Sequence, residues 1–167
     1  MREIATHVDI NAEAALVWDI LTDFATYQRW NPLVRSVLGA ARRGDTIVIT
    51  ERHGHRGTAR KPGRSATMRR IVKHIREPLE LHWLGRWGLD SIYATERRFR
   101  IESLRAGGVR FHQSEQFRGV AVPFLWSGLR RDLIPGFHAM NRALKARAER
   151  AEAENVASRA RPGGARN

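Results

Sequence analysis

The chain has 167 residues, of which 42% are hydrophobic and 28% charged, a composition typical of a globular domain rather than a disordered chain. It contains no cysteine, which excludes disulfides, zinc–thiolate sites, iron–sulfur clusters and thiol nucleophiles. Thirty basic residues against 17 acidic ones give a formal net charge of +13, which favours an anionic partner such as nucleic acid, a membrane surface or an acidic ligand.

The N-terminal part predicts one strand followed by two short helices. Residues 3–10 alternate between apolar and polar side chains, as a strand with one buried face does. Asn11 is a suitable N-cap for a helix over residues 12–23, which carry an apolar stripe. A second short helix must end before Pro32, because the residue that precedes a proline disfavours the helical conformation.

The rest of the chain predicts strands and then one long helix. A helical spacing of apolar residues predicts a helix over 125–150, kinked at Pro135–Gly136, and the Ala/Arg-rich residues 151–167 are expected to form a frayed tail. Residues 52–65 are rich in glycine, proline and arginine and are predicted to be a loop. Six segments have strand character: 33–41, 45–51, 67–76, 79–87, 91–102 and 109–118.

This order of elements predicts an α+β domain over residues 1–150, in which a curved seven-stranded antiparallel sheet wraps around the C-terminal helix. A long helix against a curved sheet can enclose a cavity, where small-molecule sites tend to lie.

Several segments resemble the polyketide cyclase/dehydrase-like branch of the START-related, helix-grip superfamily. The string VWDILTDF at residues 17–24, followed by Trp30-Asn31-Pro32, resembles the opening of that family, and LELHWLG at residues 79–85 is similar to its mid-chain strand. Arg97 occupies a position where the family commonly has histidine, so an acid–base role there is not carried over. The resemblance covers residues 2–150 and implies the helix-grip fold. It does not choose among lipid binders, hormone binders, cyclases and chaperone activators. The other segments that carry it are 96–99, 111–119 and 136–145.

Two charged residues are predicted to lie on inward faces of the sheet. Alternation places Gln113 and Glu115 with the apolar residues of strand 109–118, and Arg97 with those of strand 91–102. A turn at residues 106–108 would place Glu115 near Thr95 and diagonal to Arg97. A buried carboxylate needs a partner, so Arg97 and Glu115 are expected to form either the polar anchor of a ligand cavity or a structural ion pair. The predicted ligand-binding residues are Trp18, Trp83, Trp87, Tyr93, Arg97, Phe99, Phe111, Gln113, Glu115, Phe117 and Phe137, and core packing is the alternative explanation for the aromatic ones.

Three functions are open at this point. The first is the binding of a small apolar or amphipathic molecule between sheet and helix. The second is a cyclase/dehydratase-type enzyme in which Glu115 is the proton carrier, the best catalytic candidate, since the sequence has no nucleophile elbow, phosphate-binding loop or metal motif. The third is polyanion binding through the basic segment 52–76, in which Arg52, Arg56, Arg60, Lys61 and Arg64 are the candidate contacts.

The remaining expectations concern partners and location. The basic segment has no aromatic residue for base stacking, so we expect no specific nucleic-acid recognition. No cofactor and no metal site are expected, because His53 and His55 have no neighbouring carboxylate. The N-terminus lacks a signal-peptide pattern and residues 119–129 are too short an apolar run to span a bilayer, so a cytoplasmic protein without a transmembrane segment is expected.

Overall fold

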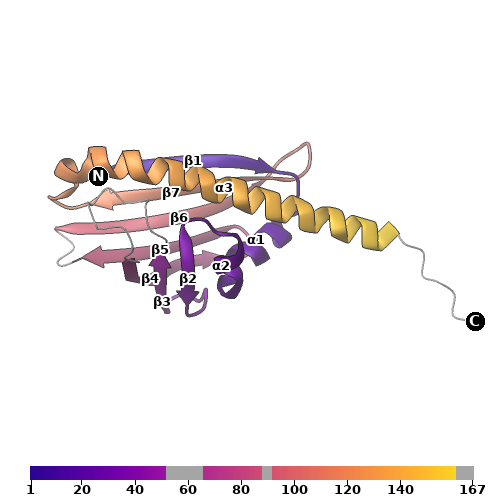
Figure 1. Ribbon diagram of the computed structural model, residues 1–167, viewed down its shortest axis with the longest axis horizontal. Coiled ribbons are helices and arrows are strands. Elements are labelled where there is room, and N and C mark those ends of the chain that lie inside the picture. The colour runs from indigo at the N-terminus through magenta and orange to yellow at the C-terminus, as the bar shows by residue number, and fades with distance from the viewer. Residues whose placement is uncertain (52–65, 88–91, 161–167) are drawn as a thin grey trace, which may run out of the picture.

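The computed structural model describes residues 1–51, 66–87 and 92–160 and confirms the predicted helix-grip architecture (Figure 1). Seven strands form one antiparallel sheet in the order β1-β7-β6-β5-β4-β3-β2, which curls into a half-barrel. The long helix α3 (Val122–Ala160) packs along β1 and β7 (Figure 1). The strands are β1 (Arg2–Ile10), β2 (Val34–Leu38), β3 (Thr46–Glu51), β4 (Ala66–Arg76), β5 (Glu80–Trp87), β6 (Tyr93–Ser103) and β7 (Val109–Arg118).

The two predicted short helices follow β1, with a turn of 3-10 helix between them. They are α1 (Ala14–Thr22) and α2 (Tyr27–Trp30), joined by η1 (Phe24–Thr26). The predicted N-cap is wrong, because α1 begins two residues later than expected and Glu13 occupies the cap position without a side-chain hydrogen bond. The backbone N–H of Asn11 instead donates to the Glu149 carboxylate of α3, at 2.8 Å. The segment that leads into α1 is therefore bound to the far end of the chain.

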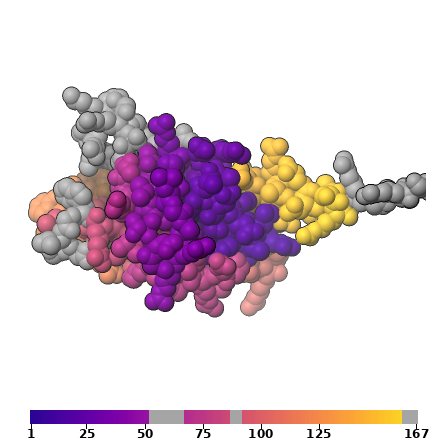
Figure 2. All heavy atoms as spheres, turned by 90° about the horizontal axis from the view of Figure 1, so that it is seen from below, coloured from indigo at the N-terminus to yellow at the C-terminus, as the bar shows by residue number. Residues whose placement is uncertain are grey.

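Helix α3 is longer than the sequence analysis predicted. It continues as one helix across Pro135 and ends at Ala160, so the expectation that residues 151–160 form a frayed tail is wrong, while residues 161–167 lie outside the described part. Alanine, glutamate and arginine dominate this last stretch and are strong helix formers, and Arg150 pairs with Glu154 one turn later at 2.9 Å. Its end projects beyond the sheet (Figures 1 and 2). No helix of the described residues is long and apolar enough to cross a membrane.

The β6–β7 hairpin sets the register of the two central strands. Ser103 stands opposite Val109, and the loop between them has five residues, closed by a hydrogen bond from the Leu104 N–H to the Gly108 carbonyl at 3.0 Å. Arg97 therefore stands directly opposite Glu115, and the predicted placement of Glu115 near Thr95 is wrong by two residues. The loop is centred on Ala106, so every cross-strand pair lies two residues from the pairing that was predicted.

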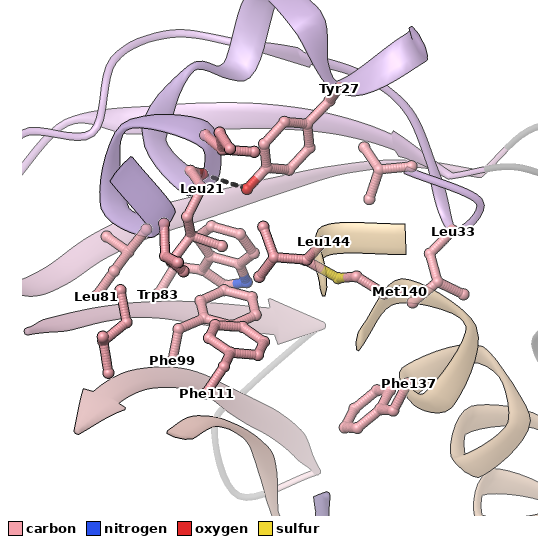
Figure 3. Close-up of a cluster of buried hydrophobic side chains, with 14 of the residues drawn as sticks. Leu21, Tyr27, Leu33, Leu81, Trp83, Phe99, Phe111, Phe137, Met140 and Leu144 are labelled. Atoms are coloured by element: carbon pink, nitrogen blue, oxygen red, sulfur yellow. Dashed lines mark hydrogen bonds between the residues drawn. The ribbon is translucent and has the colours of Figure 1, made fainter. Parts of the chain in front are cut away.

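The core lies between the inner face of the sheet and the helices, and aromatic rings form its centre (Figure 3). Trp83 packs edge-on against Phe99 with ring centroids 4.9 Å apart, and Phe99 stacks on Phe111 at 5.8 Å. The alternation predicted for β7 is confirmed: its inward residues Val109, Phe111, Gln113, Glu115 and Phe117 are all buried. Three of these are apolar, so the two polar ones stand out.

Candidate functional site

The buried ion pair between β6 and β7 is the first element of the site. The Arg97 side chain and the Glu115 side chain approach each other with Nη1 and Oε2 3.6 Å apart, and both residues are buried. The Arg97 guanidinium also lies over the Phe137 ring, 4.2 Å from its centroid. Sheet register and α3 packing thus hold one cation and one anion in the interior, where each requires a partner.

A second buried arginine, which the sequence analysis counted only as part of the basic segment, reaches the same carboxylate from β4. Arg70 Nη1 donates to Thr95 Oγ1 at 2.6 Å, and its Nη2 lies 4.0 Å from Glu115 Oε1. Its side chain crosses β5 at Gly85, where an added Cβ would lie only 1.2 Å from Nη1. Two signals could have indicated this: Arg70 alternates with the buried Val72, and a glycine interrupts the neighbouring strand.

A chain of hydrogen bonds continues from Arg97 to α3 and β1. Arg97 Nη2 donates to Gln113 Oε1, and Gln113 Nε2 donates to Asn141 Oδ1 at 3.1 Å and to the Phe137 carbonyl at 3.3 Å. Asn141 Nδ2 then donates to Thr6 Oγ1 at 3.1 Å. Asn141 was not among the predicted site residues. This chain of hydrogen bonds fixes the orientation of the Arg97 guanidinium.

The charged groups border a small interior space of about 10 Å³, which is room for about one water molecule. Tyr27 also borders it. Its hydroxyl donates to the Leu21 carbonyl (Figure 3), and burial raises the pKa of Tyr27 well above its usual value. The space therefore has apolar and aromatic walls with a compact polar centre. Its lining residues are Tyr27, Val34, Ile49, Glu51, Arg70, Trp83, Arg97, Phe99, Glu115 and Met140.

The structure brings only some of the predicted ligand-binding residues together. Trp83, Arg97, Phe99 and Glu115 line the small space. Tyr93 is partly buried beside Phe117. The side chain of Trp87 lies outside the described part, and so do Arg52, Arg56, Arg60, Lys61 and Arg64 of the basic segment. The other predicted residues do not line the space but are buried in the core, where Gln113 and Phe137 contact Arg97 and Phe111 contacts Phe99; the remaining two are Trp18 and Phe117.

The described half of the basic segment is not one basic surface. Arg70 points into the interior, and Lys73 pairs with Glu96 at 2.8 Å on the outer face of the sheet. Within residues 1–51, 66–87 and 92–160, no group of three histidine, aspartate or glutamate side chains is placed to hold a metal.

Glu96 lies on the outer face of the sheet, yet only 4% of its surface is exposed. Lys73 and Arg98 donate to its two carboxylate oxygens at 2.8 and 3.0 Å, and His82 Nδ1 lies 3.6 Å away. Burial alone would raise the pKa of Glu96, but the hydrogen bonds from Lys73 and Arg98 outweigh it and lower the pKa. Burial lowers the pKa of His82, helped by the nearby His74 and Arg98. Long basic side chains thus cover a residue that alternation correctly assigns to the outer face.

Comparisons with known proteins agree with this fold. The chain is similar to a START superfamily protein from Mycobacterium smegmatis (19% identity, TM-score 0.63, 89% of this chain and 98% of that one). It is also similar to protein CV1439 from Chromobacterium violaceum (16% identity, TM-score 0.66, 89% and 99%). A third similar structure is the di-domain ARO/CYC BexL from the BE-7585A biosynthetic pathway (16% identity, TM-score 0.68). The match covers 94% of this chain and 48% of the BexL chain.

None of the curated proteins compared with the chain matches it significantly. The family model described as "Polyketide cyclase / dehydrase and lipid transport" matches residues 1–149, which is most of the chain. The chain therefore belongs to the polyketide cyclase/dehydrase and lipid transport family.

Proposed function

We propose that the protein binds a small amphipathic molecule between the sheet and α3, with its polar end at the Arg97–Glu115 pair and its apolar body against Trp83 and Phe99. The observation that carries this proposal is the meeting of Arg70, Arg97 and Glu115 at one apolar-walled space. Burying three charges costs more than filling the same volume with apolar side chains. A role in holding the polar group of a ligand accounts for that cost.

A ligand larger than one water needs the side chains around this space to move. Met140 has a flexible unbranched thioether, and the long Arg70 side chain lies in the gap that Gly85 leaves in β5. We expect these two side chains to swing away while Arg97, which contacts Gln113 and Phe137, keeps its orientation. The family description, which names both polyketide chemistry and lipid transport, is compatible with a ligand of this kind.

The cyclase/dehydratase alternative uses the same space. Glu115 is its proton carrier, and the meeting of several titratable groups at one point supports it. The described lining offers Tyr27 as the nearest phenol, but its hydroxyl already donates to the Leu21 carbonyl and burial disfavours its ionised form. Binding is therefore the better supported of the two functions.

Binding is tested by titrating the full chain with 1-anilinonaphthalene-8-sulfonate, an anionic aromatic probe whose fluorescence rises in apolar sites. Arg97→Met should weaken probe binding about tenfold or more, because a hydrogen bond to a charged group contributes about 1.5–3 kcal/mol. Arg100→Met is the matched control: it makes the same change on the same strand, but on the exposed outer face.

Two results would contradict the proposal: the native chain fails to bind the probe, or the two variants bind it equally well. Native mass spectrometry of protein purified from its own host, searched for a retained small molecule, is the complementary measurement. A variant that combines Arg97→Met with Glu115→Gln keeps the test valid if the single variant unfolds.

A further inference from the structure

Five exposed hydrophobic residues gather at the end of the molecule where β1 and α3 begin and β7 ends (Figure 1). Phe124, in the first turn of α3, is the most exposed of them at 85%. Backbone contacts join the segments, because the Ala121 N–H donates to the Ile92 carbonyl at 3.2 Å. We call this group the apolar tip, and it consists of Met1, Ile92, Val120, Phe124 and Leu125. Contiguous exposed apolar patches rimmed by polar residues mark protein or membrane interaction sites.

Exposed arginines flank the segments of the apolar tip. Arg2, Arg118, Arg130 and Arg131 are exposed there, and Arg2 lies over the ring of Trp126 at 5.1 Å. The sequence contains no acidic residue between Arg118 and Arg131. Asp132 pairs with Arg131 at 3.2 Å and offsets one of these charges. The surface is thus apolar at its end and cationic around it.

The spacing along α3 matches the depth of a membrane interface. Arg131 follows Phe124 by seven residues, which places it on the same face of the helix about 10 Å further along. Interfacial segments bury their apolar side chains about 5–10 Å into the boundary between headgroups and acyl chains. Docking by this end of the molecule places the axis of α3 close to the bilayer normal, so Phe124 enters the acyl region while Arg131 stays at the level of the lipid phosphates.

We propose that the apolar tip docks on an anionic membrane surface, with Phe124 and Val120 inserted and the four arginines paired with lipid headgroups. A second copy of the chain is a poorer occupant, because it would bring the same four arginines face to face. An anionic bilayer supplies both an apolar phase and negative charge. This inference is independent of the interior site and goes beyond the proposed binding function.

The test is co-sedimentation of the full chain with vesicles of phosphatidylcholine containing about one quarter phosphatidylglycerol. The Phe124→Ser variant should bind these vesicles about tenfold more weakly, as expected for one buried aromatic side chain. Val156→Ser is the matched control, because Val156 is 55% exposed on the other end of α3. Both side chains are exposed, so both variants should keep the native melting temperature.

The charge contribution is tested by the double variant Arg130→Gln with Arg131→Gln. It should lose more than tenfold in vesicle affinity, at roughly fivefold per arginine, and native binding should be weak on pure phosphatidylcholine. Arg142→Gln with Arg150→Gln is the control on exposed positions further along α3. The proposal is overturned if the native chain does not sediment with the anionic vesicles or if tip and control variants bind alike. It is equally overturned if Phe124→Ser abolishes self-association and leaves vesicle binding unchanged.

Discussion

Glu115 has a guanidinium group on each side, and this makes the three buried charges of the interior depend on one another. Removing Glu115 alone leaves two guanidinium groups without their carboxylate, whereas removing Arg97 as well leaves only Arg70, which keeps its hydrogen bond to Thr95. The sequence analysis could predict Arg97 and Glu115 because a strand alternates its faces and both residues fall among apolar neighbours. It missed Arg70, because the alternation with Val72 and the glycine at position 85 indicate a buried arginine only once β4 and β5 are placed side by side.

The Arg97–Glu115 pair is expected to show strong coupling in a double-mutant cycle. Glu115→Gln should lower the free energy of unfolding by on the order of 3 kcal/mol, because it leaves the guanidinium groups without their carboxylate. Arg97→Met combined with Glu115→Gln should cost clearly less than the sum of the single changes. Urea denaturation measures all four free energies of unfolding. The exposed pair Arg100–Glu102 is the control, and we expect its coupling energy to be below about 1 kcal/mol. Additive losses of free energy at the buried pair would contradict the prediction.

Gly85 is expected to be required because of Arg70. Gly85→Ala should lower the free energy of unfolding by about 1–3 kcal/mol, since the new Cβ displaces the guanidinium from Thr95 and Glu115. In the Arg70→Ala background the same change should cost much less, because the displaced group is gone. Urea denaturation of the four proteins checks this. An equal cost in both backgrounds would show that Gly85 is needed for a reason other than the path of Arg70.

For the secondary-structure elements, the sequence predicted which face of each strand is buried but not where the hairpin and the first helix begin and end. The period of two residues assigned the inner and outer faces of β6 and β7 correctly, because one shifted residue would have buried a run of charges. The register of their hairpin depends on the conformation of five loop residues, two of them glycines with positive φ, which alternation cannot specify. The Asn11 N–H before α1 is satisfied by a carboxylate about 140 residues away in sequence, and the cap residue Glu13 makes no side-chain hydrogen bond, so the local capping signal did not locate the start of the helix.

The outer face of β5 and β6 is expected to make stability depend on pH. Burial lowers the pKa of His82 from 6.5, so the unfolded chain takes up the proton first, and stability falls as pH drops below about 6.5 towards the lower folded value. The pKa of Glu96 is lowered from 4.5, so its contribution is fully present above that value and is lost at still lower pH. On this face Glu96 accepts hydrogen bonds from Lys73 and Arg98, and His82 packs against His74.

Replacing His82 by glutamine should therefore reduce the loss of melting temperature between about pH 7 and about pH 5. Thermal unfolding followed by circular dichroism at both pH values gives the comparison. His138→Gln, on the exposed side of α3, is the control and should leave the dependence as it is in the native chain. The prediction is contradicted if the melting temperature falls by the same amount between the two pH values in both variants.

For the whole molecule, the order of elements was enough to predict the sheet and the helix that it wraps around. The curved antiparallel sheet follows from strands joined by short turns, and the position of α3 follows from its apolar stripe. The size of the interior space could not be predicted, because it depends on how the aromatic side chains and the three charges pack together. The polyanion hypothesis stays a prediction, since its candidate arginines lie outside the described residues.

Residues 1–150 are expected to fold without the end of α3. Truncation after Arg150 removes a mostly exposed stretch and the 3.4 Å hydrogen bond from the Glu13 N–H to Glu152. It should therefore lower the free energy of unfolding by less than about 1 kcal/mol. Truncation after Leu144 should abolish cooperative unfolding, because it also removes the fully buried Ala148 and the Glu149 carboxylate that accepts from the Asn11 N–H. Thermal unfolding of both truncated chains, followed by circular dichroism, separates these outcomes. Equal loss in the two chains would mean that the projecting turns of α3 are part of the folding unit.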